Sequence, residues 1–100
     1  MTVQHGFHAT MTAHPGRGDE LVDMLLDAPS LPNEDCVVFL VGRAAADRDV
    51  VHVTEGWTTE VAHSTFFATD RAQAFVAKLQ PLVSNSRYVD LVPVGGKADF

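Results

Sequence analysis

The 100-residue sequence has little cysteine, little positive charge and no long hydrophobic run. Its single cysteine, Cys36, cannot form an internal disulfide, so cysteine usage gives no support for secretion. Seven Lys and Arg residues stand against thirteen Asp and Glu residues, and the formal net charge is −6. The few basic residues are scattered along the chain, which argues against binding to nucleic acid or to an anionic membrane surface.

No apolar run approaches the roughly 20 residues that a membrane-spanning helix needs. The first twelve residues lack the basic leader and the apolar stretch of a signal peptide, so we expect a cytoplasmic protein. Hydrophobic residues make up 46% of the chain, which is enough to build a packed core. We therefore expect residues 1–100 to form one domain, with residues 95–100 as a flexible or partner-contacting tail.

Hydrophobic periodicity predicts four strands. Apolar and polar residues alternate over 7–14 and again over 50–58, as in strands with one buried face. Residues 36–41 are a β-branched and aromatic run typical of a strand buried on both faces. Residues 44–49 are expected to join the second and third strands as a hairpin. Residues 88–94 alternate as a final strand.

Two helical segments are predicted between these strands. The second segment is split, because Thr59 can cap a helix that ends near Phe67, and Asp70 with Gln73 resembles a capping box for a further helix. Pro81 should end that further helix. Each segment carries an apolar stripe at helical spacing. The stripes are Leu21, Val22, Leu25 and Leu26, and then Ala72, Phe75, Val76, Leu79, Leu82 and Val83.

The predicted order is βαββαβ, which favours an α+β, ferredoxin-like split βαβ fold with an antiparallel four-stranded sheet and helices on one face. Such a sheet leaves its other face open, with Val38, Leu40 and Val92 among the residues that the helices cannot cover. A second copy of the chain would cover them, so we expect a homodimer with its sheets face to face. A register slip of one residue would exchange the two faces.

The third predicted strand and the helix after it carry the most distinctive residues. Val51-His52-Val53-Thr54-Glu55-Gly56-Trp57 is followed by Thr59-Glu60-Val61-Ala62-His63 and Phe66-Phe67, and the chain ends near Val92-Pro93-Val94-Gly95-Gly96. These segments resemble the antibiotic biosynthesis monooxygenase family, and the element order agrees over nearly the whole chain. The resemblance implies a dimeric α+β barrel. Some family members oxygenate anthrones or quinols without flavin, haem or metal, while others degrade haem or act as cyclases or isomerases.

Oxygenation without a cofactor needs a base, a pocket that excludes water and a surface for a planar aromatic anion. The sequence has no cofactor motif, and we expect no cofactor. Trp57 is a candidate stacking surface or a core tryptophan. His63 is a candidate base near neutral pH, or a structural histidine. Glu55 shares the strand face of Trp57, and it could orient His63, act as the base, or form a salt bridge with Arg43 or Arg87.

Seven further residues are expected to line the core or a substrate pocket: Val53, Phe66, Phe67, Phe75, Phe7, Met11 and Leu25. His8 and His52 could pair across neighbouring strands, but no third ligand has a matching spacing, so we expect no metal site. His5 and His14 are expected at the surface. Val53 stands where the anthrone oxygenases have an asparagine, and the first strand has no asparagine of the haem-degrading type. Haem degradation is therefore disfavoured.

Three functions remain open from the sequence. The first is a cofactor-independent monooxygenase that oxidises a polycyclic phenol, anthrone or quinol with molecular oxygen in secondary metabolism. The second is a cyclase or isomerase that uses the same base to form an enolate without oxygen. The third is a non-catalytic dimeric module that binds a small aromatic ligand or a protein partner.

Overall fold

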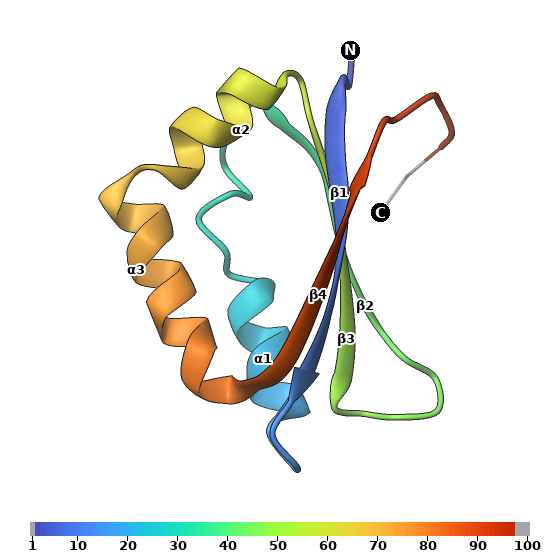
Figure 1. Ribbon diagram of the computed structural model, residues 1–100, viewed down its shortest axis with the longest axis vertical. Coiled ribbons are helices and arrows are strands. Elements are labelled where there is room, and N and C mark those ends of the chain that lie inside the picture. Colours follow the sequence, from blue (N-terminus) through green and yellow to red (C-terminus); the bar gives the residue numbers. More distant parts are fainter. Residues whose placement is uncertain (1, 98–100) are drawn as a thin grey trace.

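A computed structural model describes residues 2–97 and contains one four-stranded antiparallel sheet. All three α-helices lie on one face of this sheet (Figure 1), so the predicted α+β, ferredoxin-like fold is confirmed. None of the described helices is long and apolar enough to cross a membrane. The elements are β1 (His5–Ala13), α1 (Gly18–Leu25), β2 (Cys36–Arg43), β3 (Val50–Trp57), α2 (Glu60–Phe67), α3 (Asp70–Leu79), a 3₁₀ turn (Gln80–Leu82) and β4 (Val83–Leu91).

The strand order is β2-β3-β1-β4, so β1 and β3 are the two central strands. In this register Phe7 lies opposite Glu55 on β3 and opposite Asp90 on β4, and all three residues belong to the same face. The predicted burial of the 36–41 strand on both faces is wrong for this chain. β2 is an edge strand, and none of its residues is fully buried.

Threonine hydroxyls cap both helices of the split segment. The predicted cap of α2 is confirmed, because Thr59 Oγ1 accepts a hydrogen bond from the amide of Ala62 at 3.0 Å. The predicted capping box at Asp70 and Gln73 is wrong. Thr69 is the N-cap of α3, and Gln73 donates to the carbonyl of Phe67 at 2.7 Å instead of returning to the cap.

The last strand begins five residues earlier and ends three residues earlier than the sequence pattern predicts. β1 pairs with β4 from Gly6 to Ala13, so the ladder extends down to Val83 through residues that show no hydrophobic alternation. Residues 92–97 leave the sheet on the side away from the helices (Figure 1). Residues 98–100 of the expected tail lie outside the described residues, and its contact with a partner stays a prediction.

The core lies between the sheet and the helices, and the face of β3 that carries Val51, Val53 and Trp57 is turned towards it. Leu26 is the exception in the predicted helical stripe: α1 ends at Leu25, and the Leu26 side chain is 59% exposed. Fully or nearly fully buried apolar side chains from four elements and the 3₁₀ turn form this core: Ala9, Met11, Ala13, Leu21, Leu25, Val51, Val53, Leu79 and Leu82.

The helix-free face of the sheet is polar along its centre and apolar at its edges. His8 and His52 meet there across β1 and β3, with 3.0 Å between Nε2 of His8 and Nδ1 of His52, as the strand neighbourhood predicts. Leu40 on β2 and Val89 and Leu91 on β4 are exposed on either side of this polar centre. The expected pairing of this face with a second copy stays a prediction.

Candidate functional site

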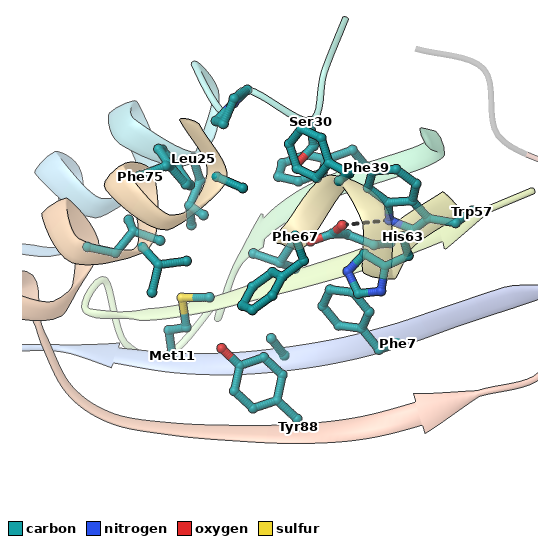
Figure 2. Close-up of a pocket in the computed structure, with 18 of the residues that line it drawn as sticks. Phe7, Met11, Leu25, Ser30, Phe39, Trp57, His63, Phe67, Phe75 and Tyr88 are labelled. Carbon is teal, nitrogen blue, oxygen red and sulfur yellow. Dashed lines mark hydrogen bonds between the residues drawn. The ribbon is translucent and has the colours of Figure 1, made fainter. Parts of the chain in front are cut away.

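A cavity of about 320 Å³ lies between the sheet and the helices. Figure 2 shows its walls: strand residues form the floor, and residues of α2, α3 and the end of α1 form the roof. Aromatic and aliphatic side chains make up most of the lining, while the histidines and carboxylates lie towards the end formed by Trp57. The exposed side chains of Phe67, Tyr88 and Asp90 lie at the rim.

All ten residues that the sequence singled out line this one cavity: Glu55, Trp57 and His63, with Phe7, Met11, Leu25, Val53, Phe66, Phe67 and Phe75. They come from β1, α1, β3, α2 and α3, so the fold brings together residues up to 68 positions apart. Their roles in binding or chemistry stay predictions.

Trp57 and Glu55 are joined by a hydrogen bond. The indole Nε1 of Trp57 donates to Oε1 of Glu55 at 2.9 Å (Figure 2, dashed line). The two side chains share a face because they are two positions apart on β3. The expected salt bridge of Glu55 is not formed: Arg43 pairs with Asp19 at 2.6 Å, and Arg87 lies opposite Thr10 on the helix-free face.

Burial raises the pKa of Glu55 to about 7, and the indole N–H of Trp57 offsets part of this rise. Near neutral pH the carboxyl group therefore exists in both protonation states, and it can accept or donate a proton inside the cavity. Burial also raises the pKa of the Cys36 thiol to about 12, with the charge of Glu55 adding to the effect. Cys36 thus stays protonated and is a poor nucleophile.

His63 lies among three aromatic rings at the same end of the cavity. The ring centroids of Trp57, Phe7 and His5 are 5.0, 5.1 and 5.1 Å from that of His63. Burial lowers the pKa of His63, and the nearby His5 lowers it further, while Asp90 and Glu60 raise it. The net direction is downward, which favours the neutral imidazole that a general base requires.

Three titratable residues of the cavity were missed or misplaced from the sequence. His5 is not a surface residue but lines the cavity, because β1 begins at His5 and brings it opposite Trp57. The alternation of His5 with Phe7 could have shown this. Tyr88 and Asp90 also line the cavity from β4, and their i,i+2 spacing was the available signal.

The remaining histidines lie outside this cavity. His14 is exposed, as expected, and the pair of His8 and His52 belongs to the other face of the sheet. Among residues 2–97 no group of three or more His, Cys, Asp or Glu side chains is arranged to hold a metal ion.

Comparison with known proteins places this geometry in a family. The model of the family described as Antibiotic biosynthesis monooxygenase matches residues 5–78. A search of the curated proteins found no match. A crystal structure from Chloroflexus aurantiacus J-10-fl, described as a candidate antibiotic biosynthesis monooxygenase, is 27% identical, with a TM-score of 0.85 over 95% of this chain and 97% of that chain.

Two further structures share the fold at lower identity. A candidate antibiotic biosynthesis monooxygenase from Caulobacter crescentus CB15 is 21% identical, with a TM-score of 0.81 over 94% of this chain and 92% of that chain. One from Deinococcus radiodurans is 19% identical, with a TM-score of 0.78 over 96% and 97%. Because the family match extends over well more than half of its residues, the chain belongs to the antibiotic biosynthesis monooxygenase family.

Proposed function

We propose that this protein is a cofactor-independent monooxygenase that oxidises a polycyclic phenol, anthrone or quinol with molecular oxygen. One observation carries the proposal: two titratable side chains lie at one end of a largely apolar cavity. The pKa of His63 is lowered, which favours its neutral form, and the pKa of Glu55 is raised to about 7. A planar aromatic substrate fits the apolar walls, and its acidic O–H or C–H group would face the two titratable side chains.

The first step is removal of a proton by His63. Molecular oxygen is a triplet and reacts slowly with closed-shell molecules, whereas an electron-rich carbanion or phenolate can transfer one electron to it. Apolar walls keep water away from this anion and strengthen its interactions with nearby dipoles. Trp57 forms one wall and holds Glu55 through its N–H, and the exposed rings of Phe67 and Tyr88 are placed to contact a planar substrate at the rim.

The remaining steps balance without an external reductant. For an anthrone, electron transfer gives a substrate radical and superoxide, and their combination forms the new C–O bond. The peroxide takes up the proton held by His63. Loss of the second C–H proton then forms the C=O bond and breaks the O–O bond, and the leaving oxygen departs as water with a proton supplied by Glu55 or His63. The substrate's CH₂ group supplies all four electrons that reduce oxygen.

The test is oxygen uptake and product formation with an anthrone and a naphthohydroquinone. We expect turnover in air, none under anaerobic conditions, and a rate on the order of 100-fold lower in His63→Ala. The exposed His14 provides a matched control, and His14→Ala should retain the wild-type rate. Equal rates for wild type and His63→Ala would show that His63 is not the base.

The same assay separates the two other functions. Turnover that continues without oxygen would contradict the monooxygenase and favour a cyclase or isomerase that works through an enolate. No turnover, together with a ligand-dependent rise in melting temperature, would favour a non-catalytic binding module.

We also propose that the protein works as a homodimer in which two helix-free sheet faces pack together. The support is the exposure of three large apolar side chains on that face, namely Leu40 at 39%, Val89 at 58% and Leu91 at 40%. Burying such side chains against a second copy removes apolar surface from water and would enclose the polar pair of His8 and His52, which already satisfy each other.

A further inference from the structure

The contact between His5 and His63 is the feature of the cavity that the proposed mechanism leaves unused. Nε2 of His5 and Nδ1 of His63 are 3.2 Å apart, and the two rings stack with an interplanar angle of 30°. His5 is held in place by the central strand β1, where it lies opposite Trp57. The pair therefore rests on the rigid sheet on one side and on α2 on the other.

This contact uses only one of the two ring nitrogens of His63. Within residues 2–97, Nε2 of His63 has no hydrogen-bond partner. Every fully buried side-chain nitrogen or oxygen among these residues does have one, so Nε2 is not fully buried. Nε2 is therefore accessible. His63 lines the cavity, and Nε2 is its ring nitrogen that the contact with His5 leaves unused.

We propose that His5 is a positioning residue that accepts the Nδ1–H of His63 and so leaves the lone pair of Nε2 free to act as the base; the proposal rests on the monooxygenase function above. A neutral imidazole carries one proton, and the partner of one nitrogen decides which tautomer forms. The opposite tautomer would put the proton on Nε2, which would then have no lone pair for the substrate.

Two carboxylates partly oppose the downward shift of the His63 pKa. Burial and the neighbouring His5 lower this pKa, Asp90 on β4 and Glu60 on α2 raise it, and Glu55 on β3 and Tyr88 on β4 line the same cavity. When Nε2 takes a proton, the imidazolium can still donate its Nδ1–H to His5, so the hydrogen bond persists through the step. Protonation of His5 itself would oppose the step, because a charged His5 cannot accept that bond and lowers the pKa of His63.

The tautomer can be read directly by NMR on protein labelled with ¹⁵N at histidine, at pH 8, because the two ring nitrogens have different shifts when protonated and unprotonated. We expect wild-type His63 to carry its proton on Nδ1. His5→Phe keeps a ring at this place but has no acceptor, so the proton should move to Nε2. His5→Gln offers an amide oxygen and should restore the Nδ1–H form. His14→Phe is the matched control and should leave His63 unchanged.

Kinetics provide the second readout. In His5→Phe we expect kcat to fall at least about tenfold with KM changed less than twofold, and His5→Gln to recover part of kcat. A wild-type His63 with its proton on Nε2, or a tautomer that His5→Phe does not alter, would overturn the inference. If His5→Phe does not fold, the wild-type and His5→Gln spectra still decide it. Absence of oxygen uptake by the wild type would refute the proposed function alone, because the tautomer is measured without turnover.

Discussion

Replacement of Glu55 by glutamine should change how stability depends on pH. The substitution keeps an oxygen that can accept the indole N–H of Trp57, now at 2.9 Å from the carboxylate, and removes only the ionisable group. In the folded chain the pKa of Glu55 is raised to about 7 from an ordinary value of 4.5. The folded state therefore binds more protons than the unfolded state between these two values, and the free energy of unfolding must fall as pH rises through this range.

The size of the effect follows from the two pKa values. Each tenfold change in proton affinity corresponds to about 1.4 kcal/mol, so a pKa raised from 4.5 to about 7 costs the wild type about 3 kcal/mol once the group is ionised. Between pH 4 and pH 8, wild type should therefore lose about 3 kcal/mol of stability relative to Glu55→Gln. Other titrating groups are common to both proteins and cancel in the difference.

Urea unfolding followed by far-UV circular dichroism measures this difference at fixed protein concentration from pH 4 to pH 8. Glu34 is an exposed carboxylate, and Glu34→Gln should follow the wild-type curve closely. Parallel curves for wild type and Glu55→Gln over the whole range would refute the reasoning. They would mean that Glu55 ionises as freely in the folded chain as in the unfolded chain.

Two further predictions concern the helix cap and the proposed dimer. Thr59→Ala removes the hydroxyl oxygen that accepts a hydrogen bond from the amide of Ala62 at 3.0 Å, and it should lower the free energy of unfolding by about 1 kcal/mol. Thr59→Ser keeps a hydroxyl group and should retain most of the wild-type stability. An unchanged urea midpoint for Thr59→Ala would contradict the capping role. Leu40→Lys should weaken self-association, measured by sedimentation equilibrium. Leu26 is an exposed leucine on the helix side, so Leu26→Lys is the matched control and should leave self-association unchanged. A dimer unaffected by Leu40→Lys would exclude the sheet face as the interface.

The fold was predictable because two strands show strong alternation. The alternation of β3 predicts that Val51 and Val53 share one face but leaves open which face is turned towards the helices. In the structure it is this face, and both side chains are buried. The last strand was misplaced because its first half owes its structure to pairing with β1 and not to its own pattern. The α3 cap was misplaced by one residue, since Thr69 and Asp70 are both good caps and local sequence does not rank them.

The site was predictable only in part. The spacing between Trp57 and His63 indicated a shared cavity, and the structure places both rings on one, 5.0 Å apart. The partners of Glu55 and His63 could not be assigned, because they depend on register. One position decides whether His5 lies over Trp57 or on the opposite face, and the sequence alone leaves the start of β1 open.

The chain contains a single tryptophan, and it is fully buried at the polar end of the cavity, bonded to Glu55 and packed against His63. Its ultraviolet emission is therefore a built-in optical reporter that needs no label. A ligand that enters the cavity, or a proton that binds to Glu55 or His63, changes the surroundings of the only indole in the sequence. Titration of that signal against ligand or acid would follow the site itself, without background from elsewhere in the chain.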